Sequence, residues 1–76
     1  MPRKKRQIRA EYRKAGFSER AGKGDHIVYW HPLLREHYVV AGADGKDALL
    51  YDERNLQRAL RALDDARKKQ SGGQQP

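Results

Sequence analysis

The chain has 76 residues and a formal net charge of +7, and it contains no cysteine. This length leaves room for one small domain, because such domains bury only about 60% of their unfolded surface. The absence of cysteine excludes disulfide bonds and thiolate metal sites, which argues against a secreted disulfide-stabilised protein and favours a reducing, cytoplasmic compartment. No apolar segment approaches the ~18 residues of a membrane span, and the basic start is not followed by the apolar stretch of a signal peptide. We therefore expect a soluble protein without a membrane-spanning or targeting segment.

The positive charge lies at the two ends of the sequence. Residues 1–14 hold seven Lys or Arg and one Glu, and residues 67–69 add three basic side chains. Residues 15–66 hold seven basic and nine acidic side chains, so the middle of the chain is slightly negative. Basic segments of this kind favour nucleic acids, because binding releases the counterions condensed on the phosphates. An anionic membrane surface is the weaker alternative, because large apolar side chains are sparse in the first basic segment.

A first helix is predicted over residues 4–15, ending at Gly16. Its apolar positions recur at offsets of four and three: Ile8, Tyr12 and Ala15. At 100° per residue, three arginines fall within about 60° of each other and away from this stripe: Arg6, Arg9 and Arg13. This arginine face either binds phosphate groups or is simply a solvated surface.

Three strands are predicted next, over residues 17–20, 26–31 and 36–41. Pro32 ends the second strand, and the following loop returns the chain antiparallel. Strand alternation places His26, Val28 and Trp30 on one face and Ile27, Tyr29 and His31 on the other. In the third strand it places Tyr38 and Val40 on one face and His37 and Val39 on the other. The aromatic residues Tyr29, Trp30 and Tyr38 either stack on RNA bases or, on the face under the helices, form the core.

A second helix is predicted to begin at Asp52, which can act as the N-cap, with Glu53 in the first turn. Tyr51 and Leu56 match the spacing of a hydrophobic staple. The apolar stripe of this helix is Leu56, Ala59, Leu60, Leu63 and Ala66. Residues 71–76 have no apolar side chain, so we expect a single domain over residues 1–70 and a disordered tail over residues 71–76. The order predicts an α+β fold in which both helices cover one face of a three-stranded antiparallel sheet.

The segment Gly22-Lys23-Gly24-Asp25-His26 is the strongest candidate for a functional site. Glycine adopts conformations that let successive backbone N–H groups converge on an anion, and histidine is the side chain that titrates nearest neutral pH. We expect His26 to do acid–base work on a phosphate held by the amides of Gly22–Gly24 and by Lys23. The alternative is that His26 is a structural residue that opens the strand.

Two neighbouring features bear on this candidate site. The carboxylate of Asp25 would repel a phosphate unless it points into the turn, as Asx side chains often do, and we expect the latter. The other histidines, His31 and His37, do not form the i, i+4 helical spacing of a metal site, and cysteine is absent. We therefore expect neither a metal nor a cofactor.

The chain resembles the HicA toxins of bacterial HicAB toxin–antitoxin pairs over roughly residues 4–63. The resemblance depends on four features: the helix ending Lys14-Ala15-Gly16-Phe17, the Gly24-x-His26 motif that enters the second strand, the pair His31-Pro32, and the closing helix over 56–63. HicA toxins commonly have Gly-Ser-His where this chain has Gly24-Asp25-His26. This chain thus differs from the common motif at Asp25, whose carboxylate would repel a phosphate unless it points into the turn.

The resemblance implies a fold similar to a double-stranded-RNA-binding domain and an mRNA interferase activity with His26 as the catalytic residue. It implies RNA as substrate and a HicB-like antitoxin protein that covers the His26 surface. In the mechanism we expect, neutral His26 removes the proton of a ribose 2′-hydroxyl without a metal ion. The residues expected to hold the RNA backbone are Arg6, Arg9, Arg13 and Lys14. The alternative is a noncatalytic RNA-binding module or an inactive relative, and the sequence predicts no oligomeric state.

Overall fold

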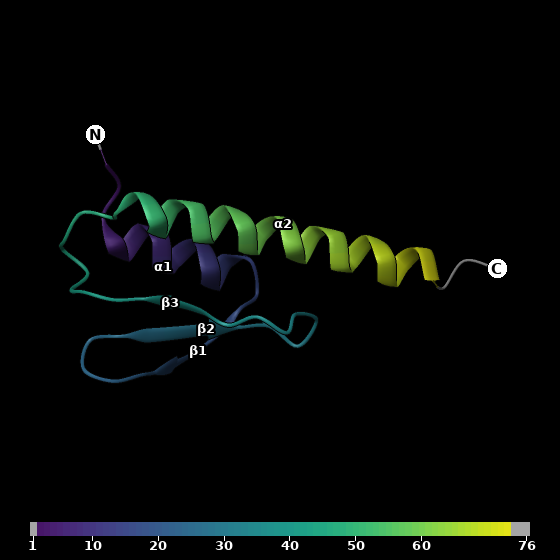
Figure 1. Ribbon diagram of the computed structural model, residues 1–76, viewed down its shortest axis with the longest axis horizontal. Coiled ribbons are helices and arrows are strands. Elements are labelled where there is room, and N and C mark those ends of the chain that lie inside the picture. Colours follow the sequence, from purple (N-terminus) through teal and green to yellow (C-terminus); the bar gives the residue numbers. More distant parts are fainter. Residues whose placement is uncertain (1, 74–76) are drawn as a thin grey trace.

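The computed structural model describes residues 2–73, and it describes side chains as far as residue 69. The elements in chain order are α1 (Lys5–Lys14), β1 (Ser18–Ala21), β2 (Ile27–Trp30), β3 (Tyr38–Val40) and α2 (Leu50–Gly73). Figure 1 shows the two helices next to each other on one side of the three strands. The predicted α+β arrangement of helix, three-stranded antiparallel sheet and helix is confirmed. Neither of the two helices, within the described residues, is both long and apolar enough to cross a bilayer.

The sheet is a meander in the order β1-β2-β3, and both pairings are antiparallel. Tyr29 pairs with Tyr38 across β2 and β3, and both side chains are buried under the helices. The intervening Val39 is 39% exposed on the opposite face. The predicted alternation of the third strand is therefore confirmed, and Tyr29 and Tyr38 are core residues rather than stacking platforms for bases.

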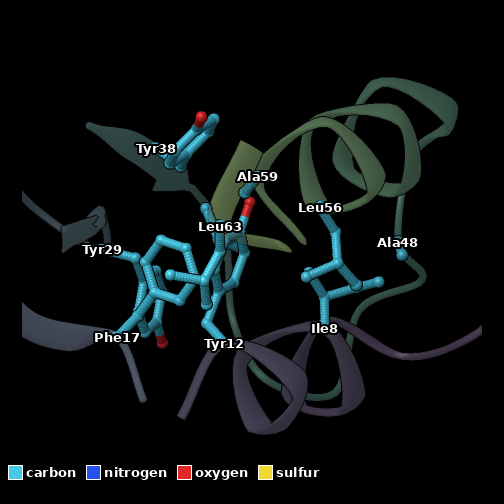
Figure 2. Packing of buried hydrophobic residues seen from close by; sticks show 10 residues of the cluster. Ile8, Tyr12, Phe17, Tyr29, Tyr38, Ala48, Leu56, Ala59 and Leu63 are labelled. Carbon is cyan, nitrogen blue, oxygen red and sulfur yellow. The ribbon is translucent and has the colours of Figure 1, made fainter. Parts of the chain in front are cut away.

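The core lies between the sheet and the two helices. The ring of Tyr12 from α1 stacks on Tyr29 of β2, with 4.6 Å between centroids and 9° between planes. Figure 2 shows this aromatic group, with Phe17 beside it, at one end of the core and Ile8 with Leu56 at the other. Burial raises the pKa of both stacked phenols, so they pack in their neutral form.

The packed face of α1 contains two cations in addition to the predicted Ile8 and Tyr12. Lys5 places its Nζ 3.0 Å from Oδ2 of Asp52, and the two side chains are only 6% and 0% exposed. This buried ion pair joins the start of α1 to the start of α2. Removal of either partner would leave an uncompensated buried charge, so loss of Lys5 or of Asp52 should be strongly destabilising.

The start of α2 differs from the prediction. The helix begins at Leu50, so Asp52 is its third residue and not its N-cap. The Asp52 carboxylate reaches back to accept a hydrogen bond from the N–H of Leu49 at 2.8 Å, as the acidic partner of a capping box does. The pairing with Lys5 draws this carboxylate inward. Tyr51 lies inside the helix and is half exposed, so it does not occupy the position before the N-cap that the predicted hydrophobic staple requires.

The end of α2 also differs from the prediction. The helix continues to Gly73, so residues 71–73 of the expected disordered tail are helical, and residues 74–76 lie outside the described residues. Once a helix is nucleated, each further residue adds one hydrogen bond for a small entropic cost, and no proline interrupts this stretch. Figure 1 shows α2 running past the end of α1. The predicted buried stripe of α2 is confirmed at Leu56, Ala59 and Leu63.

Candidate functional site

The hairpin turn between β1 and β2 is built by two backbone hydrogen bonds. The N–H of Gly22 donates to the carbonyl of His26 at 2.7 Å, and the N–H of His26 donates to the carbonyl of Lys23 at 3.1 Å. Gly24 occupies the first central position of this inner turn with φ +65°. Glycine reaches this conformation without a steric penalty, which explains why the turn needs glycine at that position.

The turn also holds the ring of His26. Nδ1 of the ring lies 2.8 Å from the carbonyl oxygen of Lys23. A carbonyl can only accept, so Nδ1 carries the hydrogen, and the lone pair of the neutral ring is on Nε2. The side chain is 50% exposed, and within the described residues Nε2 makes no hydrogen bond. The ring is therefore fixed in orientation while one basic nitrogen remains open.

Asp25 stands beside this ring. Its Oδ1 lies 3.6 Å from Nδ1 of His26, and its side chain is 63% exposed. The expected Asx turn is not formed, because the carboxylate accepts no backbone hydrogen bond from any residue that the structure describes. The contact with His26 is too long for a hydrogen bond and is open to water. It lies on the Nδ1 side of the ring and leaves the Nε2 side clear.

The predicted phosphate cradle is smaller than the sequence suggested. The N–H of Gly22 is already used to close the hairpin, so it is not available to an anion and this part of the prediction is wrong. The strand pairing extends one residue beyond β1, which the glycine pattern does not reveal. The N–H groups of Lys23 and Gly24 donate no hydrogen bond within residues 2–73. These two amides and the exposed Lys23 ammonium remain as hydrogen-bond donors for an anion.

The predicted role of Arg9 in holding the RNA backbone does not fit the structure, because its side chain is buried. It is 4% exposed, and its guanidinium is surrounded by acceptors. Nη1 pairs with the carboxylate of Asp44, and Nη2 donates to the carbonyl oxygens of Gly42 at 2.6 Å, Val40 at 3.2 Å and Asp25 at 3.3 Å. The helical spacing correctly grouped Arg9 with other arginines. It did not reveal that this side of α1 packs against the hairpin turn and the loop after β3.

The other predicted cations of α1 are exposed. Arg13 donates through Nε to Glu19 of β1 at 2.8 Å, and this hydrogen bond lowers the pKa of Glu19. Arg6 and Lys14 have no acidic partner within the described part of the chain. The backbone N–H of Arg6 donates to the carbonyl of Asp44, which places it beside the loop after β3. Lys14 lies at the other end of α1, and within the described residues no hydrogen bond or ion pair connects it to the hairpin turn.

A shallow cavity of about 340 Å³, wide open to solvent, lies where α1, the hairpin turn and the loop after β3 meet. It is lined by Arg9 and Arg13 from α1, Asp25 and Ile27 from the hairpin, and Ala43 and Asp44 from the loop. The structure thus brings the arginine face of α1 to the turn that contains His26, although Arg9 serves there as a structural clamp.

Sequence reasoning missed Arg20. This residue of β1 pairs with Val28 in the sheet register, so it lies on the same face as Val28 and the preceding His26. It is exposed and has no acidic partner among residues 2–69. Strand alternation shows only which residues of β1 share a face with Arg20. To place Arg20 on the same face as His26, the register between β1 and β2 is also needed.

The remaining histidines stand apart from this site. His31 packs edge-on against Phe17 on the helix-covered side, at the other end of β2. In the described part of the chain, no three His, Asp or Glu side chains gather in a way that could hold a metal ion. The candidate site therefore consists of one open imidazole nitrogen, two open amides and nearby exposed cations. Comparisons of the chain with protein families, curated proteins and solved structures found no match.

Proposed function

We propose that the chain is an endoribonuclease that cleaves mRNA by histidine acid–base chemistry, as its resemblance to the HicA toxins implies. The observation that supports this proposal most is the fixed ring of His26, whose Nδ1 is bound by the Lys23 carbonyl while Nε2 is open. A general base needs an accessible lone pair in a defined direction, and this turn supplies both.

In the proposed step, Nε2 of His26 takes the proton of a ribose 2′-hydroxyl, and the 2′ oxygen attacks the adjacent phosphorus. The bond from phosphorus to the 5′ oxygen breaks, and the leaving oxygen takes a proton from the imidazolium or from water. The products are a 2′,3′-cyclic phosphate and a 5′-hydroxyl. The open N–H groups of Lys23 and Gly24 are suited to stabilise the charge on the phosphoryl oxygens. Acid–base catalysis of this type contributes about 10² to 10⁴-fold.

Cations without an acidic partner would hold the RNA backbone. Within the described residues these are Lys23 in the turn, Arg20 on the His26 face of the sheet, and Arg6 and Lys14 on α1. Each phosphate contact releases condensed counterions, so RNA affinity should fall as salt rises. Replacement of Lys23 or Arg20 by Gln should reduce the salt dependence of RNA binding by about one ion per contact.

The experiment that tests the proposal is incubation of the purified chain with RNA in the presence of a chelator. We expect cleavage with 2′,3′-cyclic phosphate ends, reduced at least ~100-fold by His26→Gln. His37→Gln is the matched control, because His37 is exposed and lies outside the turn. Cleavage by the His26→Gln variant at the parent rate would reject the proposed mechanism.

The resemblance also suggests a HicB-like antitoxin as the protein partner, covering the His26 surface. Production of the chain alone in a bacterial host should then stop growth, and co-production of such a partner should restore it. The His26→Gln variant should be harmless at the same protein level. Growth arrest by this variant would show that toxicity does not come from cleavage.

A second candidate function is RNA binding without cleavage. It is favoured by one observation, the exposed Asp25 carboxylate 3.6 Å from the His26 ring, because a negative charge there opposes an approaching phosphate. The same incubation discriminates the two functions. RNA that is retained by the protein but remains intact supports the binding module.

A further inference from the structure

The cavity beside the hairpin turn contains a feature that the proposed chemistry does not use. Arg9 lines this cavity, and its Nε is buried and has no hydrogen-bond partner within the described residues. Nη1 of this guanidinium pairs with Asp44, and Nη2 donates to three backbone carbonyls. A buried donor without an acceptor is costly, so it marks a position where a ligand atom with a lone pair would be stabilising.

The rest of the lining defines which ligand would fit. Arg13 adds a second guanidinium, whereas Asp25 and Asp44 place two exposed carboxylates on the rim. The carboxylates oppose a simple anion, and the guanidiniums oppose a simple cation. The ligand must therefore present both hydrogen-bond acceptors and donors in one compact group. The apolar side chains of Ile27 and Ala43 offer surface for a flat apolar ring.

We infer that this cavity is a nucleobase subsite and that guanine is the base it fits best. Guanine presents O6 and N7 as acceptors, which suit a guanidinium, and its N1–H and N2–H are two parallel donors, which suit a carboxylate. Adenine, cytosine and uracil do not offer two parallel N–H donors beside a carbonyl acceptor. A cavity of about 340 Å³ also lies within the range of small-ligand sites.

The position of the subsite connects it to cleavage, and in this respect the inference rests on the proposed function. Asp25 lines the cavity and directly precedes His26 in the chain. The Asp25 carboxylate lies 3.6 Å from Nδ1 of His26. A guanine held on Asp25 would therefore belong to a nucleotide adjacent to the scissile phosphate. The same site would give the enzyme a sequence preference at one position.

The experiment is a titration of the full chain with GMP, AMP, CMP and UMP, followed by backbone amide NMR. Inorganic phosphate is the control for binding through the phosphate group alone. We expect GMP to shift the amides of residues 42–44 and Asp25 with an affinity at least five times that of the other nucleotides. Equal affinity for AMP, or shifts that inorganic phosphate reproduces, would overturn the inference.

Two pairs of variants sharpen this test. Ala43→Phe fills the cavity and should abolish the GMP shifts, whereas Ala10→Phe places the same ring on the exposed face of α1 and should retain them. Asp25→Asn replaces the acceptor of two N–H groups and should lower GMP affinity at least fivefold. Asp47→Asn, at an exposed acid outside the cavity, should not. Unchanged GMP binding in Ala43→Phe would contradict the subsite.

The subsite and the nuclease can fail separately. RNA cleavage that requires His26 without any GMP binding would overturn the subsite and leave the proposed function intact. GMP binding by a protein that leaves RNA uncut would overturn the proposed function and leave the subsite intact. If both hold, Ala43→Phe should remove a preference for cleavage next to guanosine while His26 still determines whether cleavage occurs.

Discussion

Strand β2 has a histidine at each end, and the two histidines have opposite environments. His26 precedes the strand on the open face of the sheet, half exposed, with Nδ1 donating to the carbonyl of Lys23. His31 follows the strand on the helix-covered side, where its Nδ1 accepts a hydrogen bond from the N–H of Leu33 at 3.1 Å. The free lone pair is thus on Nε2 of His26, whereas the neutral His31 carries its hydrogen on Nε2.

Their electrostatic surroundings differ as well. The pKa of His31 is lowered, first by burial and then by the positive charge of Arg67. Arg67 lies there because its guanidinium donates to the carbonyl of Ala15 at the end of α1. The comparison shows that the role of an imidazole depends on the partner of its other nitrogen, which residue type alone does not reveal. His26 keeps an open Nε2, whereas His31 packs against Phe17.

The largest expected effect separates these two roles in activity. His26→Ala should lower RNA cleavage at least ~100-fold, because it removes the general base. His31→Asn should stay within about threefold of the parent, because an Asn oxygen can still accept the Leu33 N–H. Initial cleavage rates of both purified variants measure the difference. A His31→Asn loss as large as that of His26→Ala would remove the distinction.

The next effect concerns the clamp that holds the His26 end of the sheet. Arg9→Met should cost about 3 kcal/mol in the free energy of unfolding, because it leaves one buried and two partly buried carbonyls without this donor. Arg13→Met should cost less than about 1 kcal/mol, because its pair with Glu19 is exposed to water. Urea denaturation measures both values. Equal costs would mean that Arg9 is not a structural clamp.

A smaller effect tests the backbone of the turn. Gly24→Ala should cost about 1 kcal/mol, because φ +65° is strained for a residue with a Cβ even though no atom lies within 4 Å of one. Gly45→Ala is the matched control, because a Cβ there also meets no atom and its φ is not in that region. That variant should be neutral or stabilised by about 0.5 kcal/mol. Thermal unfolding of the pair distinguishes backbone strain from loss of chain flexibility.

The smallest effect is a pH dependence at the His31 end. Because the folded-state pKa of His31 is lowered, the unfolded chain binds its proton first as pH falls. The contribution of His31 to stability is therefore present above its unfolded pKa of about 6.5 and is lost as pH falls toward the folded value. Unfolding curves between pH 7.5 and about 5.5 should show a shallower loss for His31→Asn than for the parent chain. An identical slope would show that His31 does not titrate differently on folding.

The sequence alone allowed prediction of the element types, their order and the faces of the strands. Alternation in Tyr38–Val40 and the four-and-three spacing of Ile8 and Tyr12 are local patterns, and the structure confirms both. The Gly24-x-His26 spacing likewise indicated a turn with a histidine at its end. Local patterns succeed here because strand pleat and helix pitch are properties of the backbone itself.

The sequence did not reveal which polar side chains would be buried. Lys5, Arg9 and Asp52 look like solvated charges in one dimension, yet all three are buried against partners that lie 16 to 47 residues away. The misplaced start of α2 has the same origin, because Asp52 joins Lys5 and caps from the third position of the helix. Such pairings depend on which segments meet in space, and no local periodicity encodes them.

The amino-acid sequence by itself determined a small α+β domain with basic ends and a histidine beside a glycine turn. Tertiary structure alone decided that Arg9 is a clamp, that the N–H of Gly22 is used within the hairpin, and that Nε2 of His26 remains open. The physical reason is that secondary structure follows from neighbouring residues, whereas the availability of a donor or a lone pair depends on every group that packs around it.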